Sequence, residues 1–189
     1  MMITIDGADK LGVKLKNFVA AFQPATKLAM NEASRKARTG SLRKTREGWN
    51  IKAKSLKSYT SMKPATNNRM EILFTIKSGG IPLKEFAMPG WLAKTREEQR
   101  ATKGVSYKVK KGGGARAKPF KGAFVEKSIS RGTKFVLVRE GESRYPLVPL
   151  TVVSPTYMFE QAEGVAVFER IFKENFVERW DHQMKRYLK

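Results

Sequence analysis

Apolar residues recur at helical spacing near the N-terminus. They are Leu11, Leu15, Phe18, Val19 and Phe22. Steps of three and four residues place them on one face of a helix, for which Asp9 is the candidate N-cap. Pro24 is expected to end or kink this helix, because proline lacks the backbone N–H that the next turn needs. A second helical run is predicted from Ala25 to about Glu47, with Gly48 as its terminator.

Alanines recur every four residues through these helical runs. They are Ala21, Ala25, Ala29, Ala33 and Ala37. Small side chains on one stripe permit another helix to approach closely. Alanine is also the strongest helix former, so the stripe can equally reflect helix propensity with little packing role.

The hydrophobic period changes in the middle of the chain. Residues 51–63 form a short basic helix or arm, and Pro64 closes it. Alternating apolar residues then predict strands at 70–77, 105–110, 123–125 and 134–139. We expect one antiparallel sheet, because no helix long enough for a parallel crossover lies between neighbouring strands.

Ser154 and Pro155 predict the start of a last helix, with serine as N-cap and proline at the first helical position. Its apolar positions, at steps of three or four, are Met158, Ala162, Val165, Phe168, Phe172, Phe176, Trp180, Met184 and Tyr187. This broad aromatic face suits a core, and a subunit contact is the other interpretation.

The sequence therefore predicts an α+β fold with N-terminal helices, a central antiparallel sheet and a long amphipathic C-terminal helix. We expect one domain: a basic helical arm over about 1–66, a β-rich core over about 67–153, and the helix over about 155–188. A chain of 189 residues is long enough to bury such a core without disulfides or metal.

Charge is the strongest compositional signal. The chain has 38 Lys and Arg against 17 Asp and Glu, a net charge of +21. Residues 151–189 hold six basic and six acidic residues, so the excess lies entirely before residue 151. Such a chain attracts polyanions, and its own copies repel one another unless a partner of opposite charge is present. DNA, RNA or an acidic protein ring could each be this partner of opposite charge.

Two segments carry the candidate cations for DNA or an acidic partner. The predicted contact residues are Lys52, Lys54 and Lys57 in the arm, and Lys108, Lys110, Lys111, Arg116 and Lys118 around a triple glycine. Glycines bring backbone N–H groups close to phosphate. No Gly-Lys-Ser or Gly-Lys-Thr follows them, which excludes a nucleotide-hydrolysing P-loop. The alternative is a flexible hairpin tip in a generally basic region.

Trp91 and Leu92 are the candidate protein-interface residues. They lie in a segment, 88–100, that interrupts the β-section. Contact with a partner and packing within the chain are equally open interpretations.

The residues for enzyme chemistry are scarce. There is no cysteine, His182 is the only histidine, and aspartate occurs only at Asp6, Asp9 and Asp181. A catalytic triad or a two-metal site lacks its components. We therefore expect no catalytic residue, no cofactor and no metal. The N-terminus lacks the pattern of a signal peptide and no apolar run reaches about 18 residues, so we expect a soluble protein without a membrane partner.

An ordered set of segments resembles the phage minor tail protein Z family across nearly the whole chain. In order, these segments are Arg43 to Trp49, Ile81 to Phe86, Gly104 to Gly112, Gly122 to Val125, Arg144 to Leu147, and Ser154-Pro155 before Met158-Phe159. Two departures stand out. The stretch from Ala87 to Lys103 is longer than the family's usual connection, and Val153 replaces the family's glycine before Ser-Pro.

The resemblance implies a non-enzymatic assembly protein that completes the head-proximal end of the tail at the head–tail junction. It implies a virion protein of the tail or neck, present in the host cytoplasm during assembly. Expected partners are further copies of itself, as a hexameric ring, then tail terminator, tail tube or neck proteins, and double-stranded DNA. The alternative from charge alone is a stand-alone basic DNA-binding protein, which would bind free DNA without any tail protein.

Overall fold

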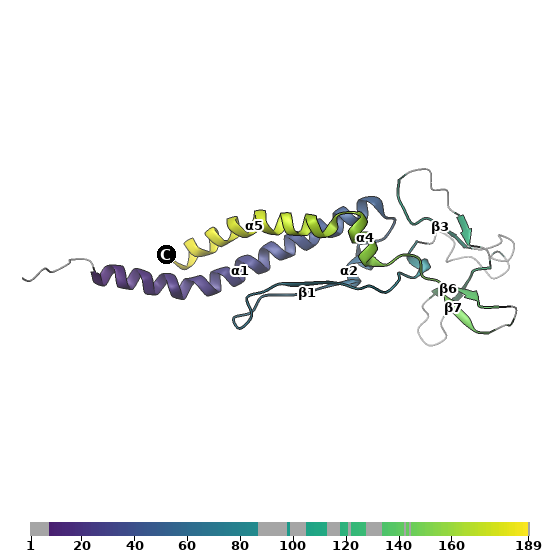
Figure 1. The fold of residues 1–189 in the computed structure, drawn as a ribbon, viewed down its shortest axis with the longest axis horizontal. Coiled ribbons are helices and arrows are strands. Elements are labelled where there is room, and N and C mark those ends of the chain that lie inside the picture. The colour runs from purple at the N-terminus through teal and green to yellow at the C-terminus, as the bar shows by residue number, and fades with distance from the viewer. Residues whose placement is uncertain are drawn as a thin grey trace, which may run out of the picture. The chain divides into compact units, whose positions relative to one another are not determined.

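The structure is a computed structural model. It describes residues 8–86, 98, 105–112, 118–120, 122–127, 134–141, 143 and 145–188. The predicted α+β class is confirmed (Figure 1). Along the chain, a long helix comes first, a section with all of the described strands follows, and a long helix comes last. Contacts divide the chain into two compact units. Unit 1 contains residues 1–41, 62–75 and 165–189, and unit 2 contains residues 42–61 and 76–164. The single-domain organisation stays a prediction.

The first helix, α1 (Ala8–Gly48), continues through Pro24, so the expectation that it ends there was wrong. Proline removes one backbone hydrogen bond of the helix and crowds the preceding turn. Packing on both sides of the proline opposes this cost. Ala21 and Ala25 are buried with Met184 of α5 (Gly164–Tyr187), and Trp180 packs on the same cluster.

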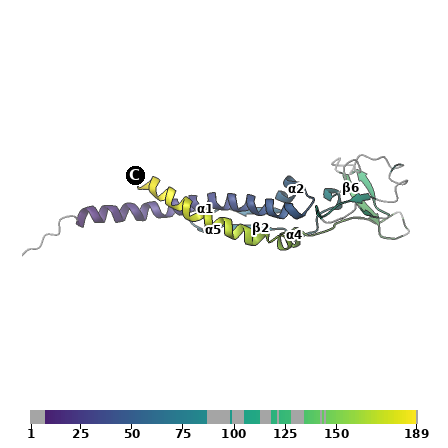
Figure 2. The same ribbon diagram turned by 90° about the horizontal axis from the view of Figure 1, so that it is seen from above.

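The alanine stripe is a packing surface. Its five alanines are 0–4% exposed, and Ser41 and Thr45 extend the same spacing with 0% exposure. Figures 1 and 2 show α1 and α5 side by side in both views. Gly40 belongs to the same contact, since a Cβ there would overlap the Ile171 side chain of α5. Of the two interpretations left open by the sequence, close helix packing is confirmed.

A β-hairpin completes unit 1. The predicted basic segment 51–63 divides into α2 (Ala53–Ser58) and β1 (Thr60–Lys63), and β1 pairs with β2 (Leu73–Ile76), which lies inside the predicted strand. The hairpin tip is tied to α1 by the Asn31 side chain, which donates to the Ala65 carbonyl at 3.1 Å and accepts from the Ala65 N–H at 2.8 Å.

The predicted C-terminal helix is broken in two. Ser154 Oγ accepts from the Tyr157 N–H at 3.1 Å and caps α4 (Pro155–Gln161), as predicted, but α4 ends before Glu163, whose φ is +53°. The second part, α5, begins at Gly164. A Cβ at Gly164 would lie 2.7 Å from both Phe159 Cδ1 and Thr45 Oγ1, so only glycine fits at this position without displacing them. This close approach explains why the chain turns here.

The aromatic face of α5 packs partly on the hairpin. Phe74 of β2 stacks on Phe168 with ring centroids 4.7 Å apart. Phe168, Phe172 and Phe176 continue as a row of nearly parallel rings. All four rings are half-buried. The face therefore has an intramolecular partner at its Phe168 end.

The remaining strands lie in unit 2 and are short. β3 (Val105–Tyr107) pairs with β4 (Lys118–Phe120), while β5 (Phe124–Lys127), β6 (Lys134–Arg139) and β7 (Leu147–Pro149) form a three-stranded sheet, all antiparallel. With β1–β2, the described strands divide into three sheets where the sequence predicted one. Pro119 and Pro149 lie in paired strands and donate no backbone hydrogen bond, which limits extension of each sheet. A buried cluster around Val105 and Val136, with Leu83 of the 3-10 helix η1 (Leu83–Phe86), is the core.

Candidate interaction surfaces

Backbone pairing joins the end of α1 to the segment that contains three of the predicted cations. Asn50 N donates to the Val109 carbonyl at 2.7 Å, and Lys111 N donates to the Gly48 carbonyl at 3.0 Å. Trp49 and Lys110 form the antiparallel bridge between these bonds. We call residues 48–50 and 109–111 the Trp49 ladder.

Side chains strengthen the Trp49 ladder. Trp49 is buried and makes an edge-to-face contact with Tyr157, with centroids 6.1 Å apart. Lys110 Nζ lies 5.3 Å from the Trp49 ring centroid, a cation–π distance. The Asn50 side-chain amide donates to the Lys108 carbonyl at 3.0 Å. The backbone that carries Lys108, Lys110 and Lys111 is thus fixed in unit 2.

The predicted cations of the arm follow the ladder directly. Lys54 and Lys57 project from α2, Lys52 precedes it, and all three are exposed, whereas Leu56 on the same helix is fully buried. Leu56 therefore anchors α2 and its lysines face solvent. Ser55 Oγ donates to the Glu85 carboxylate and fixes the helix further. The structure brings the two predicted basic groups into one unit, connected through the Trp49 ladder.

Other predicted residues are not placed. Arg116, Trp91 and Leu92 lie outside the described residues, and for Lys118 only the backbone, in β4, is described. Three further cations directly before the ladder were not among the predicted contact residues: Arg43, Lys44 and Arg46. With Lys52, Lys54 and Lys57, they give residues 43–57 six cations against one acidic residue, Glu47. This local density was visible in the sequence and would have identified them.

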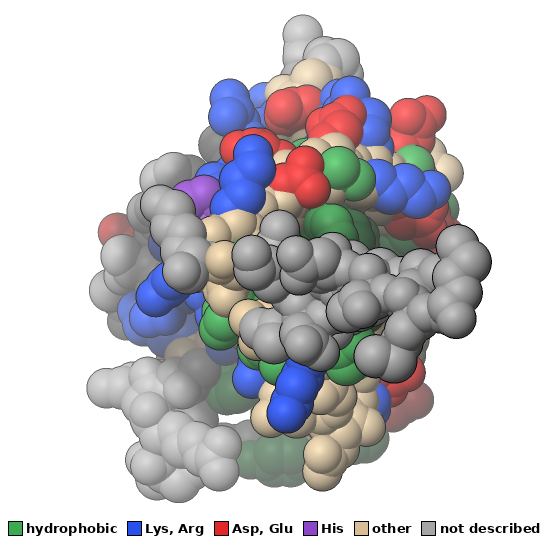
Figure 3. Space-filling view, turned by 90° about the vertical axis from the view of Figure 1, so that its left-hand side faces the viewer, with side chains coloured by type: hydrophobic (Ala, Val, Ile, Leu, Met, Phe, Trp, Pro, Cys, Tyr) green, Lys and Arg blue, Asp and Glu red, His purple; other side chains and the backbone are tan. Residues whose placement is uncertain are grey.

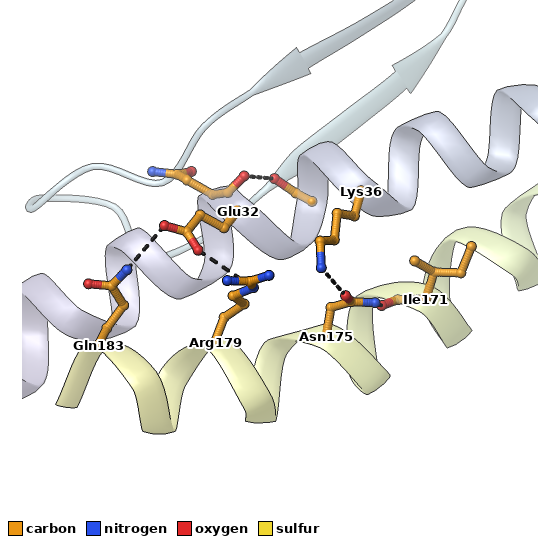
Figure 4. Close-up of polar contacts among 8 residues, drawn as sticks. Glu32, Lys36, Ile171, Asn175, Arg179 and Gln183 are labelled. Atoms are coloured by element: carbon orange, nitrogen blue, oxygen red, sulfur yellow. Dashed lines mark hydrogen bonds and ion pairs between the residues drawn. The ribbon is translucent and has the colours of Figure 1, made fainter. Parts of the chain in front are cut away.

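A polar network crosses the α1–α5 contact in unit 1. Figure 4 shows Glu32 of α1 between Gln183, which donates to it at 3.1 Å, and Arg179, whose Nε lies 3.8 Å from the carboxylate. One turn further on, Lys36 donates to Asn175 at 2.9 Å. No local sequence pattern predicts these pairs, because they join residues about 140 or more positions apart. They fix which turn of α5 faces which turn of α1.

Within the described part of the chain, no three His, Asp or Glu side chains gather as metal ligands would. His182 is exposed near the end of α5, as expected. Burial raises the pKa of the Tyr59 phenol above its usual 10.0, and the negative charge of Glu85 adds to this effect. Tyr59 packs close to a fixed carboxylate and needs no functional explanation.

Among the helices of the described residues, none combines the length and the apolar character that a membrane crossing requires.

Comparison with known proteins gives one match. The model of the family described as prophage minor tail protein Z (GPZ) matches residues 5–189. The match covers α1, both units and the C-terminal helix. No curated protein and no solved structure matches the chain.

Proposed function

The chain belongs to the prophage minor tail protein Z family, and from this premise we propose that it completes the head-proximal end of a phage tail, without enzymatic activity, at the head–tail junction. The family match over nearly the whole chain is the observation that carries this proposal. In this proposal, the protein acts in the virion as a homo-oligomeric ring of six copies. Its partners are tail terminator, tail tube or neck proteins.

The exposed cations around the Trp49 ladder support a charge-driven contact. Lys54 and Lys57 project from an anchored helix that Lys52 directly precedes, and Lys110 and Lys111 belong to the hydrogen-bonded Trp49 ladder. Fixed cations bind an anionic surface with less loss of conformational entropy than cations on a free loop. We propose that these residues anchor a DNA terminus or dock onto acidic neighbouring rings.

Electron microscopy of tails assembled with and without the protein tests the assembly role. We expect an extra ring at the head-proximal tip when the protein is present, and failure of head joining when it is absent. Tails that look the same and join heads equally well in both preparations would contradict the proposal.

A charge variant tests the proposed contact residues. Lys52→Gln/Lys54→Gln/Lys57→Gln removes three exposed cations near the Trp49 ladder. The matched control, Lys77→Gln/Arg170→Gln/Lys173→Gln, removes three exposed cations that belong to neither predicted basic segment. We expect the first variant to reduce head joining and the control to retain it. Equal loss in both would assign the effect to net charge and reject a local site.

The net charge of +21 favours a second function, stand-alone DNA binding. That function predicts tight binding to a free duplex with a steep dependence on salt, since each neutralised phosphate releases counterions. Binding to a 30-base-pair duplex, measured over a range of NaCl concentrations, separates the two functions. The assembly role predicts that tails lacking the protein compete effectively with DNA, and the alternative predicts that they do not.

A further inference from the structure

Five large apolar side chains are exposed at one end of the α1–α5 pair. They are Phe18, Val19, Phe22, Tyr187 and Leu188, with exposed fractions of 42–71%. Phe18 contacts Phe22, and Phe22 makes an edge-to-face contact with Trp180 of α5 at 6.0 Å. Met184, three residues before Tyr187, packs on Ala21. These contacts bring the three residues of α1 and the two residues near the C-terminus to the same end of the α1–α5 pair. We call the five residues the free-end patch.

The base of the free-end patch is fixed. Trp180 Nε1 donates to Thr26 Oγ1 at 3.0 Å, and Met184 and Ala21 beneath it are only 5% and 4% exposed. The first turns of α1 extend beyond the end of α5 in both ribbon views (Figures 1 and 2). Exposed apolar side chains gathered on a fixed base are typical of a protein-binding site, because the base loses little conformational freedom on binding.

The charges that adjoin the patch along each helix are cationic. Residues 10–31 of α1 contain four lysines and no acidic residue, and residues 182–189 contain Lys185, Arg186 and Lys189 and no acidic residue. Acidic residues of α5 begin one turn earlier, at Asp181 and Glu178. Figure 3, viewed from this end, shows apolar side chains at the surface between charged side chains of both signs, Lys and Arg as well as Asp and Glu. A second copy would bring the same cations together and be repelled.

We propose that the free-end patch binds an acidic protein surface that offers apolar side chains of its own. Charge complementarity selects the acidic partner, and the three aromatic rings, those of Phe18, Phe22 and Tyr187, supply the contact area at which binding energy concentrates. This inference rests on the proposed function, because tail or neck proteins are then the source of that surface.

Two other classes of partner fit the patch less well. A DNA duplex is bound chiefly through its phosphates and offers little to Phe18, Val19 and Leu188. A lipid surface is bound by a continuous apolar face along one helix. The free-end patch is built from two helices, and beyond Phe22 the alanine face of α1 is buried.

The test uses Phe18→Ser/Val19→Ser in the full chain, which removes two of the five apolar side chains of the patch and leaves Phe22 on Trp180. The probe is tails assembled without this protein. We expect binding to these tails to weaken about tenfold or more, as for the loss of an interface hot spot. Circular dichroism should be unchanged. The matched control is Val165→Ser/Val177→Ser, which removes two apolar side chains of α5 that are 45% and 63% exposed, and it should bind within about twofold of the unaltered protein.

Each other outcome overturns the inference in a recognisable way. If the unaltered protein binds tails and the patch variant binds equally well, the patch inference fails and the proposed function stands. If the unaltered protein does not bind tails, both fail. A patch variant that loses self-association in sedimentation assigns the surface to a second copy. One that loses binding to vesicles of phosphatidylglycerol and phosphatidylcholine assigns it to lipid.

Discussion

Asn31 shows how a single side chain can position a whole hairpin. Its amide group makes two hydrogen bonds with the backbone of Ala65, which is itself buried. The Asn31 side chain both donates to and accepts from the Ala65 backbone, as a residue of a neighbouring β-strand would. The hairpin tip is therefore hydrogen-bonded to α1 in the way that a strand is bonded to its partner. Gln23 and Lys27 add bonds to Asn67 on the same tip. Because α1 supplies all of these partners, the tip depends on the helix for its order.

Replacing Asn31 with alanine should free the tip of the hairpin. Two bonds are lost and the buried Ala65 backbone is left unpaired, at a cost of about 1–3 kcal/mol. Amide hydrogen exchange at Ala65 should accelerate correspondingly, while exchange in α5 stays unchanged. Asn68→Ala is the control, since Asn68 is exposed on the same turn. Unchanged protection of Ala65 in the Asn31 variant would show that the two bonds do not hold the tip.

Gly164 is the residue at which the sequence and the structure disagree most. The apolar spacing continues smoothly from Met158 to Tyr187 and predicts one helix, but the close approach of Phe159 and Thr45 to the glycine is a tertiary contact that spacing does not encode. Gly164→Ala should destabilise the protein by about 1–3 kcal/mol, as overpacking of a tight contact does. Gly48→Ala, where an added Cβ meets nothing within 4 Å, should change stability by less than about 0.5 kcal/mol. Denaturant unfolding of both variants measures the difference.

At the scale of elements, the helices were the most predictable part of the fold. Their apolar periods predicted helical structure over the residues of α1, α4 and α5, but as two runs within α1 and as one helix across α4 and α5. Ser154 marked the start of α4 correctly. Pro24 misled the prediction because a local rule was overridden by buried contacts at Ala21 and Ala25. Strand positions such as 134–139 were also correct, since alternation is local. Their division into three sheets was not predictable, because pairing depends on partners distant in the chain and on prolines within paired strands.

The alanine stripe makes the helix contact the part of unit 1 least tolerant of larger side chains. Ala33→Leu introduces three extra carbons at a position with 0% exposure, and we expect a loss of about 1–3 kcal/mol in stability. Ala166→Leu makes the same change at an exposed position of α5 and should be close to neutral. Thermal unfolding of the two variants checks this. Equal melting temperatures would mean that the helices separate easily to admit the leucine.

At the scale of the whole molecule, charge is the property that the sequence showed most clearly and the fold changes least. Arg116, Trp91 and Leu92 lie outside the described residues, so their contacts stay a prediction. The structure describes Lys52, Lys54, Lys57, Lys108, Lys110 and Lys111, and their role as contacts also stays a prediction. Their pattern was local and dense, and the Trp49 ladder connects the two groups that the sequence presented separately.

The same charge should make the free protein more stable in salt. With 38 cations against 17 acidic residues, repulsion outweighs attraction across the molecule. The ion pairs Lys44–Glu47 and Arg69–Glu71 are largely exposed and contribute little to stability. Screening of these pairs by salt therefore removes little stability. Raising NaCl from about 20 to 300 mM shortens the Debye length to below about 10 Å and should raise Tm by roughly 2–4 °C, the shift that about 1 kcal/mol produces in a protein of this size. The variant Lys52→Gln/Lys54→Gln/Lys57→Gln, with three fewer charges, should show a smaller rise. A Tm that falls with salt would mean that specific ion pairs, and not net repulsion, control the stability of the unbound chain. The excess positive charge would then not destabilise the free protein.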